Sequence, residues 1–279
     1  MAEVALVSLL GLCVGSFLNV VIHRLPLMLL SRWRHECAEL LGHPLPQGER
    51  FDLISPPSHC PSCRTAIKPW HNIPLLSYLW LKGRCAACGA PISPRYPVVE
   101  GLTALLSAAC ALQLDGLALA GALLLTWALI ALSFIDLDHQ LLPDEITLSW
   151  LWLGLGFNLF GIFAPLRSAV SGAMAGYLTL WSFYHLFRIM TGKEGMGYGD
   201  FKLLAMVGAW VGLVKLPLVI LLASLSGAVV GTVLILLGRL ERGKAIPFGP
   251  FLAFAGWIAL LWGDRIVEGY LRWLGSASP

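Results

Sequence analysis

Two aspartates stand at the borders between polar and apolar sequence, where they are placed to act together. Asp136 ends an apolar run in the sequence LSFIDLDHQLLPDEITL, and Asp200 follows the glycine-rich sequence GMGYG at the head of another apolar run. Two carboxylates in one site do not readily ionise together, so one keeps a proton while the other polarises a water molecule. This pair predicts the chemistry of an aspartic hydrolase attacking an amide, in which the two groups titrate as a unit.

The charged residues around this pair have simpler interpretations. Asp138 belongs to the same stretch as Asp136 and is the reserve candidate for its role. Asp144 follows Pro143 and precedes an apolar run, which is typical of a helix N-cap. Lys202 is placed either to reach the lipid headgroups or to bias the charge of Asp200. The alternative interpretation of Asp200 itself is a helix cap after a flexible glycine loop.

Four cysteines form two C-x-x-C pairs in the sequence HCPSCRTAIKPWHNIPLLSYLWLKGRCAACGAPISPRYP. Two such pairs bring four thiolates into a tetrahedron around zinc, and a site closed by four sulfurs leaves no position for catalysis. We therefore expect a structural zinc ion bound by Cys60, Cys63, Cys85 and Cys88. The alternatives are disulfides or redox-active pairs. The other cysteines and the nearby histidines are not needed as ligands: Cys13, Cys37, Cys110, His59 and His71.

Composition places these residues in a membrane protein. Of the 279 residues, 57% are hydrophobic and only 13% charged, and the mean hydropathy is +0.76. A helix needs roughly 20 apolar residues to cross a bilayer, and the chain has about eight such runs or near-runs. The runs are 2–23, 98–114, 117–135, 146–164, 168–190, 201–214, 216–238 and 248–263. The expected fold is an all-α polytopic membrane protein of about eight transmembrane helices.

The distribution of basic residues predicts the orientation of these spans. Fifteen of the nineteen Lys and Arg residues fall on one side if the polar segment after the first run is cytoplasmic. Because basic loops stay in the cytoplasm, the N-terminus is expected outside and both aspartates at the cytoplasmic face. The net charge of +3 is too small to indicate nucleic acid as a partner. The lipid bilayer is the expected surrounding.

This arrangement divides the chain into four parts. They are a first transmembrane helix at 1–23, a cytoplasmic zinc-binding domain at 24–97, a seven-helix membrane core at 98–264 and a C-terminal tail at 265–279. The sixth run is short for a span, so Asp200 is expected slightly inside the bilayer, where an acid needs a partner. The small-residue sequences GAMAG and SLSGAVVG predict close helix packing.

Several motifs together resemble the prepilin peptidases, the type IV leader peptidases of the bacterial inner membrane. GSFLNVVIHRLP at 15–26 is similar to the N-terminal signature of that family, and the cysteine pairs with ISPRYPVVE are similar to its cytoplasmic zinc domain. DLDHQLLPD and GYGDFKLL resemble its two aspartate motifs, and IPFGPFLA resembles a further stretch. The resemblance runs in order along nearly the whole chain.

The resemblance implies a function and its site residues. It implies cleavage of type IV prepilins and type II secretion pseudopilins after a glycine, at the cytoplasmic membrane face, with Asp136 and Asp200 as the catalytic pair. It also implies methylation of the new N-terminus with S-adenosylmethionine. The residues themselves indicate no site for this methyl donor, because no G-x-G-x-x-G follows a strand.

Other classes of protein remain as alternatives. The intramembrane acids suit a carrier that relays protons, although only one glycine-interrupted segment is present instead of two. DLDH also suits Mg²⁺ binding in a membrane phosphotransferase, although such an enzyme would need more acids and more basic phosphate contacts. A scaffold without catalytic activity is the third alternative. Replacement of Asp200 and treatment with a chelator discriminate among these alternatives.

Overall fold

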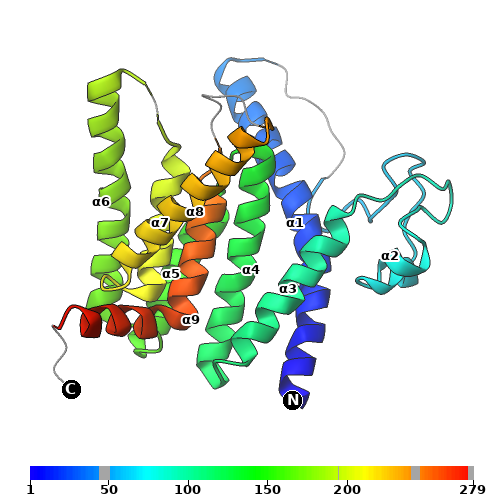
Figure 1. Cartoon of the computed structure of the whole chain (residues 1–279). Coiled ribbons are helices and arrows are strands. Elements are labelled where there is room, and N and C mark those ends of the chain that lie inside the picture. The colour runs from blue at the N-terminus through cyan, green and yellow to red at the C-terminus, as the bar shows by residue number, and fades with distance from the viewer. Residues whose placement is uncertain (44–50, 194, 240–245, 276–279) are drawn as a thin grey trace. The chain divides into compact units, whose positions relative to one another are not determined.

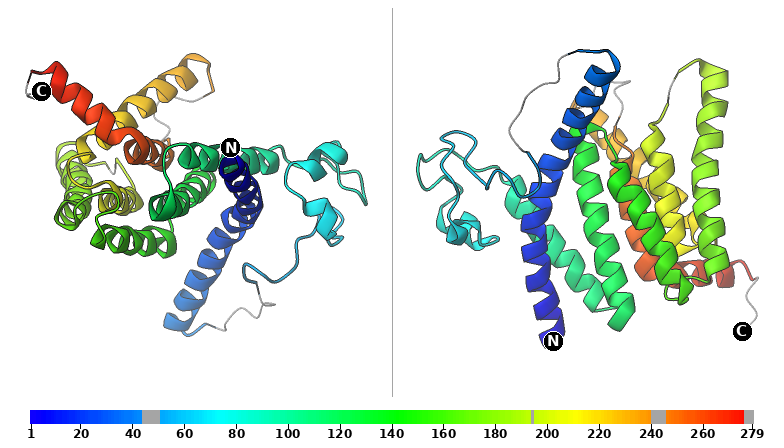
Figure 2. Two further views of the ribbon diagram at one scale, coloured as in Figure 1. Left: turned by 90° about the horizontal axis from the view of Figure 1, so that it is seen from below. Right: turned by 180° about the vertical axis from the view of Figure 1, so that it is seen from behind.

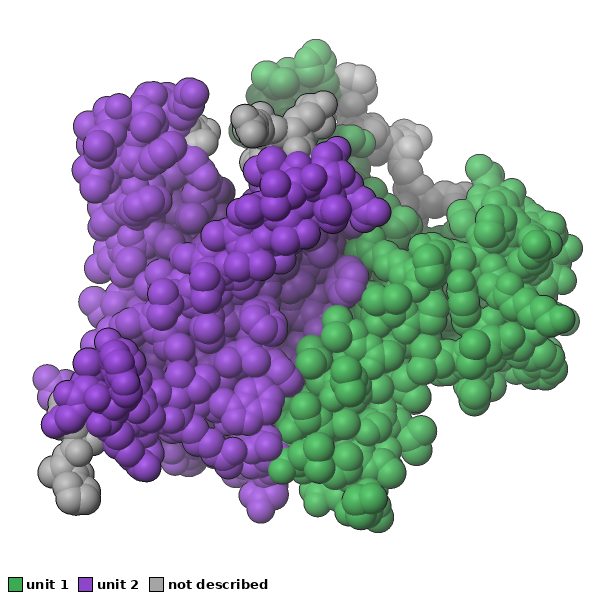
Figure 3. All heavy atoms as spheres, viewed as in Figure 1, with its two compact units in different colours: residues 1–112 green, residues 113–279 purple. Residues whose placement is uncertain are grey.

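The computed structural model describes residues 1–43, 51–193, 195–239 and 246–275, and these are helical with no extended strand. The expected all-α class is therefore confirmed. The chain divides into two compact units, Met1–Leu112 and Gln113–Pro279, coloured separately in Figure 3. The helices are α1 (Ala2–Leu40), the 3₁₀ helix η1 (Pro69–Asn72), α2 (Leu76–Trp80), α3 (Arg95–Ala111), α4 (Gly116–His139), α5 (Asp144–Leu159), α6 (Leu166–Thr191), α7 (Tyr198–Val211), α8 (Leu216–Leu236) and α9 (Gly249–Trp273).

Each of the eight expected apolar runs coincides with a helix of the structure. Among the described residues, α1, α4, α8 and α9 are long and apolar enough to cross a membrane. The other four helices are shorter or less apolar, and α7 has only 14 residues. Helix α1 does not end with its apolar run at residue 23 but continues to Leu40.

In the first unit, α1 and α3 pack closely because glycines face α3. A Cβ added at Gly11 would come within 2.8 Å of the Cα of Ala104, and one at Gly15 within 2.7 Å of the Cα of Glu100. Backbones can approach this closely only where a side chain is missing. Helix α3 thus belongs to the unit of α1, whereas the sequence grouped residues 98–264 as one core.

Buried polar side chains tie the cysteine-containing segment to these two helices. The guanidinium of Arg24 donates to the carbonyls of Asp52 at 2.9 Å and Pro56 at 2.7 Å. The carboxylate of Glu100 accepts the N–H of Leu75 at 2.8 Å. Leu75 has a φ of 57°, a conformation that is costly for a leucine. These bonds attach the start and the middle of the segment to α1 and α3.

In the second unit, α7 is the central helix, and α5, α6 and α9 pack around it (Figure 1). From Asp200 to Gly212 every residue is buried except Lys202, which is partly exposed. Gly172 and Gly176 of α6 lie against the backbone of α7, and a Cβ at Gly176 would come within 2.6 Å of the Leu204 carbonyl oxygen. The close packing predicted from GAMAG is confirmed.

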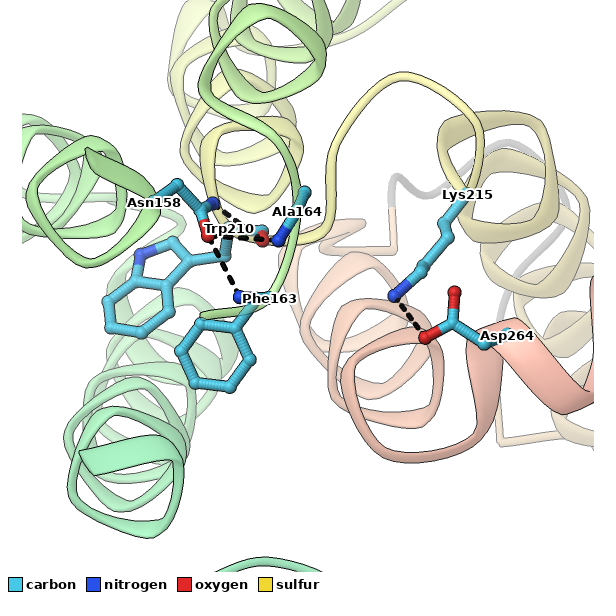
Figure 4. Close-up of polar contacts among 6 residues, drawn as sticks. All are labelled: Asn158, Phe163, Ala164, Trp210, Lys215 and Asp264. Carbon is cyan, nitrogen blue, oxygen red and sulfur yellow. Dashed lines mark hydrogen bonds and ion pairs between the residues drawn. The ribbon is translucent and has the colours of Figure 1, made fainter. Parts of the chain in front are cut away.

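The C-terminal end of α7 is held by one amide side chain, shown in Figure 4. Nδ2 of Asn158 donates to the carbonyls of Ala209 at 2.8 Å and Trp210 at 3.0 Å. Its Oδ1 accepts the N–H groups of Phe163 and Ala164, both at 3.0 Å. The last carbonyls of a helix lack partners within it, and buried ones need another donor. Asn158 supplies this donor to α7, a helix of only 14 residues whose last carbonyls are buried.

Helices α8 and α9 are joined near the same end of the unit. The ammonium of Lys215, buried at the start of α8, forms an ion pair of 2.8 Å with Asp264 of α9 (Figure 4). Beyond Asp264 the last turns of α9 are largely exposed and turn away from the other helices of the unit (Figure 2).

Candidate active site and cysteine cluster

Asp136 and Asp200 are both buried at one end of the second unit. There the C-terminal end of α4 meets the N-terminal ends of α7 and α9. The C-terminal ends of α6 and α8 lie on the same side of the unit (Figure 1). Asp136 is in the last turn of α4, and Asp200 is the third residue of α7. Their exposed fractions are only 5% and 8%. Burial of a carboxylate is costly unless other groups compensate for its charge, so two at one place require explanation.

The local sequence explains why Asp136 lies in the last turn of α4. The helix ends at Gln140, which has a left-handed φ of 50° and donates its N–H to the carbonyl of Asp136 at 2.9 Å. Leu142 precedes Pro143, and a residue before proline favours extended backbone, so the helix does not resume until Asp144. The carboxylate of Asp136 therefore stays in the final turn beside this reversal of the chain.

The local sequence also explains the position of Asp200. Gly197 is the N-cap of α7, and its extended backbone starts the helix. The carboxylate of Asp200 lies near Gly197 and interacts with its backbone. An acid at the third helical position that reaches back to the N-cap makes one half of a capping box, and Gly197 has no side chain to complete it. The position of Asp200 thus also fits the alternative interpretation, in which it belongs to a helix cap.

The elements that carry the two carboxylates meet at Leu142. A Cβ at Gly199, next to Asp200, would come within 2.9 Å of the Leu142 Cβ. A Cβ at Gly249, whose N–H contacts Asp136, would come within 3.3 Å of the Leu142 Cδ2. The structure thus brings together the two aspartates that the sequence singled out.

Gly249 is a site residue that the sequence analysis did not identify. Its N–H, in the first turn of α9, donates to Oδ2 of Asp136 at 2.9 Å. The N-terminus of a helix favours a negative charge. A Cβ at this position would come within 2.6 Å of the same oxygen, so any other residue here would displace the carboxylate. The signal in the sequence was Gly249–Pro250, a glycine followed by a proline that favours a helix start.

The other acids near the pair are placed differently. Asp138 is exposed, which leaves Asp136 as the buried acid of that motif. Asp144 is the first residue of α5, not its N-cap, which is Pro143. The carboxylate of Asp144 accepts two hydrogen bonds from Nζ of Lys202, both of 2.7 Å. Lys202 is therefore engaged with Asp144 instead of with the headgroups or with Asp200.

The four cysteines of the C-x-x-C pairs gather as predicted. The sulfur atoms of Cys60, Cys63, Cys85 and Cys88 all lie within 4.8 Å of one another, and none of these cysteines is in a disulfide. Sulfurs bound at 2.3 Å in a tetrahedron are about 3.8 Å apart. The sulfurs of Cys60 and Cys88 are 3.9 Å apart. The cluster thus has the dimensions of a tetrahedral metal site.

The two cysteine pairs are built alike. Arg64 and Gly89, each four residues after the first cysteine of a pair, have φ values of 56° and 73°. Each donates its N–H to the carbonyl of that first cysteine, at 2.9 Å in both cases. Hydrogen bonding from Thr65 lowers the pKa of the Cys63 thiol to about 6. A backbone hydrogen bond from Ala90 acts to lower the pKa of the Cys88 thiol, but the neighbouring thiol of Cys63 and burial raise it to about 11, so the thiolate, the form that binds metal, is favoured at Cys63 and not at Cys88.

A methyl-donor site is not evident among the described residues. A cavity of about 480 Å³ lies between α6 and α8. Its lining is aliphatic apart from Thr179 and Ser224. S-adenosylmethionine carries an adenosine, a sulfonium and an amino-acid group, which need polar and charged partners. The cavity therefore does not fit this molecule, and no residue is assigned to it.

Comparisons with known proteins place this site in context. A model of the bacterial peptidase A24 N-terminal domain matches residues 9–114, and one of the type IV leader peptidase family matches residues 123–232. Curated relatives carry the name prepilin leader peptidase/N-methyltransferase. One from Aeromonas salmonicida is 59% identical over 96% of this chain and 93% of its own length, and one from Pseudomonas aeruginosa is 57% identical over 99% and 96%. One from Legionella pneumophila is 46% identical over 95% and 93%. No solved structure matches.

Proposed function

The chain belongs to the type IV leader peptidase family, and from this premise we propose that it cleaves the leader of type IV prepilins and type II secretion pseudopilins after a glycine and then methylates the new N-terminus. The carrier and the phosphotransferase have no support among the relatives. The observation that supports cleavage by this chain is the pair of buried aspartates at the meeting point of α4, α7 and α9.

Asp136 and Asp200 act as the catalytic pair in this proposal. Two negative charges on neighbouring buried carboxylates repel each other, and a single shared proton removes that repulsion. The ionised carboxylate takes a proton from water as the water attacks the peptide carbonyl, and the protonated one donates to the carbonyl oxygen. The N–H of Gly249 supports negative charge on Asp136.

The cysteine cluster holds zinc in a structural role. Four cysteine sulfurs fill a tetrahedral coordination sphere, so the ion fixes the two cysteine pairs and leaves no open position for substrate. Cys60, Cys63, Cys85 and Cys88 are its ligands. S-adenosylmethionine supplies the methyl group for the second reaction, and its contacts are not assigned to residues.

The protein resides in the inner membrane of a bacterium with its N-terminus in the periplasm. The basic residues support this topology, since Arg188, Lys202 and Arg239 belong to the same ends of the helices as the aspartates. Both the aspartate pair and the zinc domain then face the cytoplasm. Lys193 also lies there, whereas Arg242 and Lys244 lie outside the described residues.

The test is to reconstitute the chain with a prepilin and to compare three variants. Asp136→Asn and Asp200→Asn are expected to lower the rate of leader release at least about 100-fold, because each removes a group that exchanges protons with the substrate or water. A Cys60→Ala/Cys63→Ala variant is expected to lose zinc but to keep both aspartates in place. If Asp200→Asn releases the leader at the wild-type rate in a folded protein, the two-aspartate mechanism is wrong.

A further inference from the structure

The ion pair of Lys202 and Asp144 lies beside the aspartate pair and joins two helices that are distant in sequence. Lys202 is two residues after Asp200 on α7, and Asp144 is the first residue of α5. Both carboxylate oxygens of Asp144 accept from Nζ at 2.7 Å, which fixes the direction as well as the distance of the contact. The side chain of Asp144 is 51% exposed and that of Lys202 is 31% exposed, so this ion pair lies at the surface of the unit.

The segment that ends at Asp144 also contacts both catalytic elements. It leaves α4 at Gln140, four residues after Asp136, and Pro143 gives it an extended backbone. Leu142, buried in its middle, packs against Gly199 on α7 and Gly249 on α9. Residues 140–144 thus form a connection with one end attached to the helix of Asp136 and the other held by Lys202 on the helix of Asp200.

The burial of Leu142 is what makes the ion pair matter to the carboxylates. A Cβ at Gly199 would overlap Leu142, which shows that α7 and the connection are already in van der Waals contact. The N–H of Gly249 is held on the other side by Asp136. If the connection moved away from α7, Leu142 would lose its contacts with Gly199 and Gly249, and the separation of the helices that carry the two carboxylates would change.

From this geometry we propose that Lys202 and Asp144 are positioning residues for leader cleavage, which together set the distance between Asp136 and Asp200. The inference rests on the proposed function, because it assigns a role within that reaction. Neither residue touches the substrate bond. Their ion pair acts through Leu142, by holding the connection 140–144 against the start of α7.

A partly exposed ion pair contributes little to overall stability, so its loss is expected to affect the chemical step more than the fold. Misplacement of a catalytic group by about 1 Å costs up to about 100-fold in rate. We therefore expect Asp144→Asn and Lys202→Gln each to lower kcat about tenfold or more. KM for a prepilin peptide and the unfolding temperature should stay near the wild-type values.

A double-mutant cycle distinguishes a paired role from two separate ones. If the residues act only through each other, Asp144→Asn/Lys202→Gln loses no more activity than either single variant. Lys202→Arg keeps the charge and should retain most of the activity. The matched control is Glu268→Gln, which breaks the exposed ion pair with Arg272 on α9 and should leave kcat unchanged.

The reference measurements separate this inference from the proposed function. If the wild-type chain releases no leader, or if Asp136→Asn and Asp200→Asn release it normally, the proposed function itself fails. If the wild type is active and both aspartate variants are inactive, the double-mutant cycle decides whether Lys202 and Asp144 have the positioning role. The positioning role is wrong if Asp144→Asn and Lys202→Gln keep the wild-type kcat. It is also wrong if the fold-loss of kcat in the double variant equals the product of the two single losses.

Discussion

Gly249 is the position at the candidate active site where an added side chain would directly meet the carboxylate of Asp136. Its N–H donates to Oδ2 of Asp136 at 2.9 Å, and a Cβ added at Gly249 would come within 2.6 Å of the same oxygen. We expect Gly249→Ala to lower kcat for leader cleavage about 100-fold, since the added Cβ would displace the carboxylate. The measurement is the initial rate of leader release in detergent or nanodiscs.

The control for this variant is Gly156→Ala in α5, in the same unit. A Cβ at Gly156 meets no atom within 4 Å, and alanine favours a helix over glycine. This control should keep full activity. Equal rates for Gly249→Ala and Gly156→Ala would show that the contact between Gly249 and Asp136 has no role in cleavage.

At the residue scale, the sequence predicted the aspartates and cysteines because their chemistry depends on side-chain type and local spacing. Asp136 and Asp200 each border an apolar run, and the two C-x-x-C pairs define a cluster by themselves. Gly249 was missed because it contributes a backbone N–H, which every residue except proline has. The partner of Lys202 was missed because the contact spans 58 positions of the chain.

Among the elements, α7 depends most on a neighbour. Its 14 residues span about 21 Å, less than the roughly 30 Å of a bilayer's hydrocarbon core. Its last carbonyls are therefore buried, and Asn158 donates to two of them. The N–H groups of Phe163 and Ala164 depend on the same side chain.

We accordingly predict that Asn158→Leu destabilises the second unit by about 3 kcal/mol or more, because leucine fills the same space but leaves buried polar groups without partners. The measurement is the thermal unfolding temperature of the purified protein in detergent. Ser226→Ala is the control, since the Ser226 hydroxyl bonds only carbonyls of its own helix. If both variants unfold at the same temperature, Asn158 does not hold the end of α7.

At the element scale, helix positions were predictable and helix lengths were not. Each apolar run became a helix because apolar sequence of this length favours helix in a membrane. The end of α1 was placed at residue 23 because charged residues begin there, and charge marks the end of a span but not of a helix. Pro26 did not end α1 either, because a helix can continue through one proline with a local loss of hydrogen bonding.

For the whole molecule, the division into units differs from the one drawn along the sequence. The sequence separated residues 24–97 as a domain because they are polar, whereas the first unit joins that segment with α1 and α3. Packing of Gly11 and Gly15 against α3 and the bond from Leu75 to Glu100 make that unit, and such contacts link distant positions. The family models divide the chain at nearly the same place, with matches to 9–114 and 123–232.

This division predicts that zinc loss acts on the first unit alone. Among its described residues, the segment between α1 and α3 has only short helices and two isolated bridges, His59 with Ala66 and Arg84 with Pro91. Few of its side chains are buried, so a bound ion supplies much of the free energy that orders it. Helices α4 to α9 form their own compact unit, in which α5, α6 and α9 pack around α7.

Removal of zinc, by a strong chelator or by Cys60→Ser/Cys85→Ser, should therefore expose residues 51–94 to protease and leave 113–239 protected. The measurement is limited proteolysis with identification of the fragments by mass spectrometry, with the metal content determined in parallel. Cys110→Ser is the control, since Cys110 lies in α3 away from the cluster and its loss should not release metal. Cleavage throughout α4 to α9 at the same rate as in 51–94 would mean that the two units do not unfold separately, and that the ion stabilises the entire chain.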